Sequence, residues 1–215
     1  MPAKKKIATK TPGKNGAGNK SAGKKMPPPR LPVLAEEVLT PEQAALLHSI
    51  RSGPRGGNVG IRGPFAVFLH APAFGELAQQ LGAHCRFNTS VPPRLSEFAV
   101  LATAKLWRAQ FEWFAHVPQA ERAGVSKETI CDLHRGRLPK SAPADERAIY
   151  DFIQELYKTR RVSDRSFKRV HAVLGDAATV ELVGILGYYV MISMILDVFR
   201  MPPPENEPLP FPEAR

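Results

Sequence analysis

Apolar side chains recur every three or four positions along most of this chain, which is the spacing of an amphipathic helix. No competing strand pattern, with its alternation of apolar and polar residues, is evident. Prolines, glycines and capping residues divide the chain into segments, and this division predicts an all-α fold. Helices are expected at residues 41–51, 64–70, 72–87, 94–106, 110–123, 126–134, 145–160, 164–174 and 176–199.

Several of these helix ends carry recognisable signals. Thr40 is a suitable N-cap, Pro41 suits the first helical position, and Glu42 complements the positive end of the helix dipole. Ser126 is expected to cap another helix, and Gly124 is expected to end the helix before it. The ends of the first, fifth and sixth helices are therefore predicted from local chemistry.

The segment from Val180 to Phe199 is apolar enough to raise the question of a membrane. Its uncharged part, between Glu181 and Asp197, has 15 residues, or about 22 Å of helix, against a hydrocarbon core of about 30 Å. It is also apolar on more than one face, as expected when one face packs inside and another meets a partner. We predict a buried or subunit-interface helix and no membrane span.

The net charge of +10 is concentrated at one end of the chain. Residues 1–30 contain eight lysines, one arginine and no acid, whereas the remaining 185 residues are nearly neutral. Such a tail buries too little apolar surface to fold, so residues 1–30 are expected to be disordered. It suits weak nonspecific contact with nucleic-acid phosphates, although a solvated extension without a partner is the simpler interpretation. Residues 31–200 are predicted to form the helical domain, and residues 201–215 a Pro-rich extended tail.

The two cysteines, Cys85 and Cys131, match neither a Cys-x-x-Cys redox motif nor a zinc pattern. Together with the absence of an apolar secretory core in the Lys-rich tail, this favours a cytoplasmic location. The sequence also lacks His-x-x-x-His and Glu-x-x-His pairs, so no metal and no cofactor are predicted.

The main chemical candidates are Glu112 and His116, which lie four residues apart and so on one helix face. Glu97 stands in an apolar stretch, where a carboxylate needs a partner or a raised pKa. The three residues form a candidate proton-handling cluster. A plain structural pair in a buried turn is the alternative for Glu112 and His116, and a structural acceptor is the alternative for Glu97.

The segments 92–97, 111–116 and 120–125, in this order, resemble the carboxymuconolactone decarboxylase family. Segments 63–72 and 181–189 fit as well, so the resemblance covers roughly residues 31–202. It implies an alkylhydroperoxidase D-like helical bundle that assembles into a ring, as a trimer or hexamer, with the site completed by a neighbour. The implied ligand is a small anionic lactone or carbonyl substrate.

The wider alkylhydroperoxidase D pattern has a Glu, two cysteines and a His at fixed spacing. Laid on this sequence, the Glu and His fall on Glu97 and His116, whereas the cysteine places fall on Ala109 and Glu112. Peroxide reduction by that dithiol mechanism requires both thiols. A peroxiredoxin-type activity is therefore not expected, even though the resemblance extends to that superfamily.

Decarboxylation of a carboxylated lactone needs a general acid and groups that hold an anionic substrate. This chemistry predicts His116 as the acid, with Glu112 orienting it or exchanging protons with it and Glu97 holding its tautomer. Further substrate-binding candidates are His70, Arg62, Arg94 and Trp113. Each has a structural alternative. His70 could interact with the C-terminal end of its helix dipole, Arg62 and Arg94 could face solvent, and Trp113 could pack in the core.

Two other functions remain open at this point. One is a relative of the hydroperoxidases that keeps the fold without the redox cysteines. The other is a non-catalytic binding protein whose basic tail contacts nucleic acid.

Overall fold

The computed structural model describes residues 26–138, 141–204 and 207–212. Most of the Lys-rich tail predicted at residues 1–30 lies outside these ranges. Within them the secondary structure is entirely helical, which confirms the predicted all-α class. The elements are the 3-10 turn η1 (Glu36–Val38) and the helices α1 (Pro41–Ser52), α2 (Pro64–Phe68), α3 (Pro72–Phe87), α4 (Pro93–Trp107), α5 (Gln110–Ala123), α6 (Lys127–His134), α7 (Ala144–Thr159) and α8 (Asp164–Phe199).

The predicted helix ends are present. The Thr40 side chain accepts a hydrogen bond from the Gln43 N–H, and the Gln43 side chain accepts one from the Thr40 N–H, forming a capping box. Ser126 caps α6 through the Thr129 N–H. Gly124 ends α5 in the left-handed conformation, with φ of 96°. These ends depend on neighbours in the sequence, which is why the sequence identified them.

The two helices predicted at residues 164–174 and 176–199 form one continuous element, α8, with a break inside it. Gly175 has φ of 74° and ψ of −174°, which is not helical. A residue with a side chain is strained at such a positive φ, so glycine permits the bend. The prediction of two helical segments is correct, and their boundary is the single residue Gly175.

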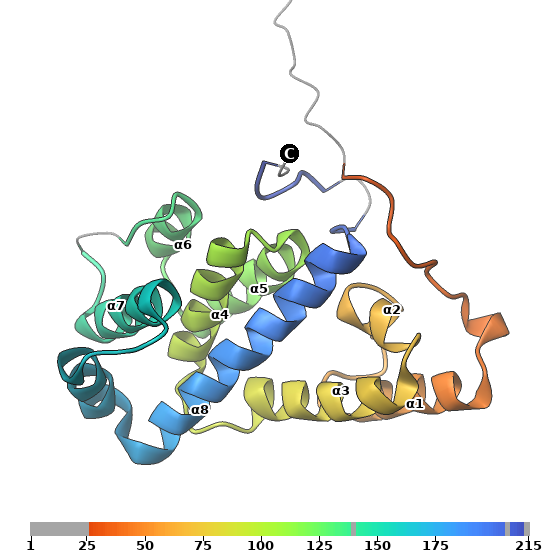
Figure 1. Ribbon diagram of the computed structural model, residues 1–215, viewed down its shortest axis with the longest axis horizontal. Coiled ribbons are helices and arrows are strands. Elements are labelled where there is room, and N and C mark those ends of the chain that lie inside the picture. The colour runs from red at the N-terminus through yellow and green to blue at the C-terminus, as the bar shows by residue number, and fades with distance from the viewer. Residues whose placement is uncertain (1–25, 139–140, 205–206, 213–215) are drawn as a thin grey trace, which may run out of the picture.

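Helix α8 runs diagonally across the molecule and divides it into two groups of helices (Figure 1). On one side α4 packs against α5, α6 and α7, and on the other side α1, α2 and α3 pack together. Both groups contact α8. The core is densest around α4, where Phe98, Ala99 and Leu101 are fully buried. The seam between α5 and the α1–α3 group, with α8 beneath it, is where the cavity described below lies.

By length and composition alone, α8 could also cross a membrane, with a mean hydropathy of 2.0 in its most apolar window. A core helix of a folded protein passes the same test. Here α8 contacts α2, α3, α4 and α7, and side chains such as Leu182 and Ile185 are fully buried. Part of its hydrophobicity is therefore used for packing in this fold, and the rest is exposed.

The C-terminal segment is extended but more firmly held than the sequence suggested. Phe211 is 2% exposed and lies against the rings of Trp113 and His134. The Gln110 side chain pairs with the Phe211 backbone in both directions, through bonds of 2.8 and 2.9 Å. Near the other terminus, Arg30 donates from its backbone and side chain to the last carbonyls of α8. Arg30 therefore contacts the folded body.

Candidate active site

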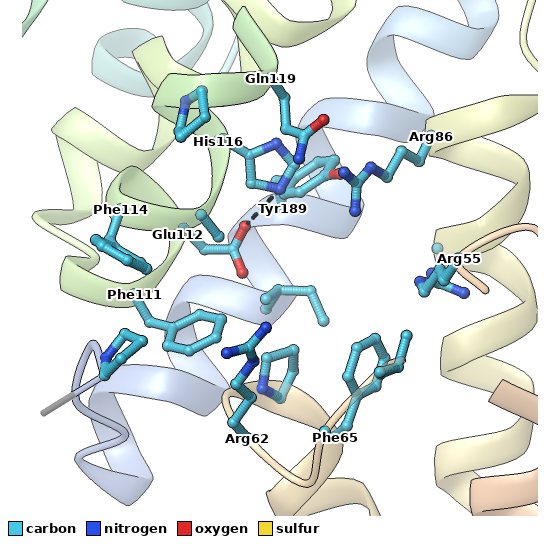
Figure 2. Close-up of a pocket in the computed structure, with 18 of the residues that line it drawn as sticks. Arg55, Arg62, Phe65, Arg86, Phe111, Glu112, Phe114, His116, Gln119 and Tyr189 are labelled. Atoms are coloured by element: carbon cyan, nitrogen blue, oxygen red, sulfur yellow. Dashed lines mark ion pairs between the residues drawn. The ribbon is translucent and has the colours of Figure 1, made fainter. Parts of the chain in front are cut away.

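A cavity of about 420 Å³ opens between α5 and the α1–α3 group (Figure 2). Its α5 wall includes Glu112 and His116, and α8 contributes Tyr188 and Tyr189. The opposite wall carries arginines from the loop after α1 and from α3. This size is within the range of small-molecule sites, which is about 300 to 1,000 Å³.

His116 is held between two carboxylates on opposite sides of its ring. Its Nδ1 lies 2.7 Å from Glu97 Oε2, and its Nε2 lies 3.3 Å from Glu112 Oε2. The three side chains are 7%, 12% and 5% exposed, in the order His116, Glu97 and Glu112. Tyr189 packs edge to face on the imidazole, with ring centroids 5.0 Å apart. The structure thus brings together all three residues of the predicted proton-handling cluster.

The two carboxylates differ in position. Glu97 reaches His116 from α4 and does not line the cavity, whereas Glu112 and His116 both do. Glu112 Oε2 is within ion-pair distance of His116, yet it is buried and accepts no well-aligned hydrogen bond from the described residues. A buried carboxylate oxygen in that state has spare capacity to accept a proton or a hydrogen bond. Glu112 is therefore the carboxylate placed to meet a ligand.

The surroundings of His116 set its charge. Burial lowers the pKa of the imidazole, but Glu112 and Glu97 outweigh burial and raise that pKa to about 9. His116 is thus an imidazolium at neutral pH. Both ring nitrogens face carboxylates, and the described ranges contain no group of three or more His, Cys, Asp or Glu side chains arranged for a metal ion.

This pKa predicts how stability depends on pH. The pKa of His116 rises from its ordinary value of 6.5 to about 9 on folding, so its contribution is complete below pH 6.5 and lost as pH rises through about 9. We expect the free energy of unfolding, measured in urea, to fall by about 3 kcal/mol across that interval. His116→Gln should lack this fall. Parallel curves for the two proteins would contradict the raised pKa.

Of the other predicted substrate-binding residues, only Arg62 lines the cavity. The Arg94 guanidinium, expected to bind substrate, is paired with Asp145 and, at 2.6 Å, with Glu146 of α7. Trp113, expected near the substrate, lies instead against His134 and Phe211. His70 is also outside the cavity, with Nε2 2.9 Å from the Pro32 carbonyl oxygen. These three side chains are used to join elements of the fold.

Sequence reasoning missed two cavity arginines, Arg55 and Arg86, and the role of Tyr188 and Tyr189 as cavity walls. Arg55 follows α1 in a Gly-rich loop, and Arg86 is in the last turn of α3, so neither stands in a local pattern that indicates a site. Tyr188 and Tyr189 lie in a long apolar helix of the sequence, which predicts packing and gives no sign of a cavity.

One glycine is required by the cavity wall. A Cβ at Gly82 would lie 2.0 Å from the Tyr188 hydroxyl oxygen and 2.9 Å from Arg55 Nη2. Contacts that short are not tolerated, so the missing side chain is what lets the Tyr188 hydroxyl and the Arg55 guanidinium approach α3.

Neither thiol of the chain lines this cavity. Cys85 is buried in α3 and Cys131 is exposed on α6. The two places where the alkylhydroperoxidase D pattern has cysteines are Ala109, immediately before α5, and Glu112. The site therefore combines a His116 imidazole held between two carboxylates with a wall that carries no thiol.

These features define an all-helical protein with a buried imidazolium site on the seam of its two helix groups. Its fold is that of the alkylhydroperoxidase AhpD core. A crystal structure of an AhpD core, an uncharacterized peroxidase-related protein from Ralstonia eutropha JMP134, matches it with a TM-score of 0.68. The match covers 84% of this chain and 95% of that chain at 16% identity. No protein-family model and no curated protein matches the sequence.

Proposed function

We propose that this protein is a carboxymuconolactone-decarboxylase-like enzyme that transfers a proton to a small anionic lactone or carbonyl compound. The observation that supports this most is the His116 imidazolium between two carboxylates, because one of them, Glu112, faces a cavity with arginines on its far wall. A purely structural ion pair would not need to open onto such a cavity.

In the proposed reaction, the bond between the substrate carbon and its carboxylate breaks and carbon dioxide leaves. The electron pair stays on the substrate and is delocalised into the conjugated lactone carbonyl. The His116 imidazolium then gives its proton to a carbon of this delocalised anion, directly or through Glu112. Neutral His116 recovers a proton from solvent. Glu97, at 2.7 Å from Nδ1, is a positioning residue that fixes the ring and stabilises its charge.

The AhpD core fold alone does not decide between this chemistry and peroxide reduction, since one fold hosts different reactions. The site residues favour proton transfer, because dithiol reduction of a peroxide needs a thiolate and a resolving thiol in the cavity. Cys85 and Cys131 both lie elsewhere. Arg62, at the cavity, is a group that the proposal assigns to substrate binding.

We also place the enzyme in the cytoplasm as a homo-oligomer, a trimer or a hexamer. Helices α3 and α8 carry exposed apolar side chains at helical spacing, which a second copy would cover. They are Phe74, Leu77, Leu81 and Phe87 of α3, and Val180, Val183, Met194 and Val198 of α8.

The experiment that tests the proposed function is carbon dioxide release by the purified full chain on enzymatically generated γ-carboxymuconolactone. We expect release in step with lactone consumption, and a rate that declines as pH rises through about 9, where His116 loses its proton. A protein that leaves the lactone intact at every pH would refute the decarboxylase proposal, although the fold would stand.

A further inference from the structure

Three guanidinium groups on the cavity wall, those of Arg55, Arg62 and Arg86, have no carboxylate partner among the described residues. Arg62 is already assigned to substrate binding in the proposed function, which leaves Arg55 and Arg86. Arg55 donates to the Gln79 amide oxygen at 3.3 Å and lies over the Phe65 ring, 5.3 Å from its centroid. Arg86 lies over the Phe87 ring at 5.1 Å. Other arginines of the described chain do pair with acids, namely Arg51, Arg94, Arg135, Arg137 and Arg169.

Unpaired guanidiniums in a cavity are unfavourable in the empty protein. Burial lowers the pKa of Arg55, which means that the surroundings disfavour its positive charge, and the nearby charge of Arg86 acts in the same direction. The Tyr188 and Tyr189 hydroxyl groups only partly oppose this. An anion bound between the two guanidiniums would remove the repulsion and supply the missing partner.

We infer that Arg55 and Arg86 form a subsite for the carboxylate of a small organic acid, opposite Glu112 and His116. Binding of a carboxylate at this subsite does not depend on the proposed function. The reaction of a ligand bound there does rest on the proposed function. A ligand held there by its carboxylate would direct its remaining atoms toward α5 (Figure 2).

The rest of the cavity indicates the body of this ligand. The lining includes the aromatic rings of Phe65 from α2, Phe111 from α5 and Tyr189 from α8. A flat apolar body packs well on such rings, and an anionic head pairs with guanidinium through two parallel bonds. The combination fits an unsaturated or aromatic carboxylate better than a fully polar anion such as inorganic phosphate.

The geometry around Arg55 has the character of a built site. Gly82 has no side chain to crowd Arg55 Nη2, which lies 2.9 Å from where a Cβ would be, and the Gln79 amide oxygen accepts a hydrogen bond from Nη1 at 3.3 Å. Gln79 is itself buried and donates to Ser49 and Glu76, which fixes the orientation of its amide. The guanidinium is thus positioned before a ligand arrives, which lowers the entropy lost on binding.

The test uses benzoate as the probe, titrated by calorimetry into the full chain at constant ionic strength. Benzamide has nearly the same shape without the charge, and we expect it to bind at least about tenfold more weakly. Arg55→Gln and Arg86→Gln should each weaken benzoate binding about tenfold to 100-fold. Arg165→Gln, an exposed arginine in the first turn of α8, removes the same charge outside the cavity and should change nothing.

Two further measurements sharpen the result. Arg55→Lys keeps the charge without the two parallel donors, so its loss of affinity should lie between those of the wild type and Arg55→Gln. Circular dichroism checks that each variant is folded. The inference is overturned if folded variants bind benzoate as the wild type does, if benzamide binds equally well, or if inorganic phosphate binds more tightly than benzoate.

Failure of this subsite and failure of the proposed function are distinguishable. Arginine-dependent benzoate binding without turnover of the lactone would retain the subsite and refute the decarboxylase. Lactone turnover with an unchanged KM in Arg55→Gln and Arg86→Gln would retain the enzyme and remove both arginines from substrate binding.

Discussion

Replacing His116 with glutamine is expected to lower carbon dioxide release from γ-carboxymuconolactone about 100- to 10,000-fold, the range for loss of a general acid. Glutamine has an amide that can still donate a hydrogen bond to Glu97, but it has no titratable proton near neutral pH. The loss should appear in kcat, because the proton is transferred during the reaction and does not hold the bound substrate. The measurement is a steady-state rate at saturating lactone.

The matched control is His48→Gln, the same substitution at an exposed position of α1. Its rate should equal that of the wild type. Circular dichroism separates loss of chemistry from loss of fold, since the glutamine is placed between two carboxylates. A folded His116→Gln protein with the wild-type kcat would remove His116 from the proposed mechanism.

Replacing Arg94 with methionine is expected to lower the free energy of unfolding by about 3–5 kcal/mol, the usual cost of breaking a buried ion pair. Its partner Glu146 is 2% exposed and takes the Arg94 Nη1 bond at 2.6 Å. Among the described residues, its other side-chain hydrogen bond is a long one that Thr129 donates, at 3.4 Å. Methionine would therefore leave a buried negative charge without its cation.

Urea unfolding measures this effect, and two proteins control it. Arg94→Met combined with Glu146→Gln should recover part of the lost free energy of unfolding, because a neutral amide replaces the buried carboxylate. Arg165→Met, at an exposed position, should change stability by less than about 0.5 kcal/mol. Benzoate affinity should be unaltered in folded Arg94→Met. Normal stability with weakened benzoate binding would instead return Arg94 to the role of a substrate ligand.

Arg94 and Glu97 lie one turn apart on α4, and this links the two predictions. Arg94 joins α4 to α7, while Glu97 reaches across to His116 on α5. Residues three apart lie on neighbouring parts of one helix face, so the contact with α7 and the contact with α5 leave α4 within one turn.

The helices and the central cluster could be predicted from sequence for a local reason. Capping residues, prolines and helical spacing act over a few positions, so Thr40, Ser126 and Gly124 mark helix ends correctly. Glu112 and His116 share a face because they are four residues apart on α5. Glu97 joins them because a carboxylate in an apolar stretch needs a partner, and the structure puts it 2.7 Å from the ring.

The surroundings of this cluster were decided only by the tertiary structure. Arg94 has the same local appearance as a substrate-binding arginine, but the packing of α7 on α4 places Asp145 and Glu146 against it. Arg55 and Arg86 come from elements far apart in the chain and meet only because α1 and α3 pack together beside the cavity. Sequence spacing determines which side chains share a helix face, whereas the packing of helices against each other determines what those faces meet.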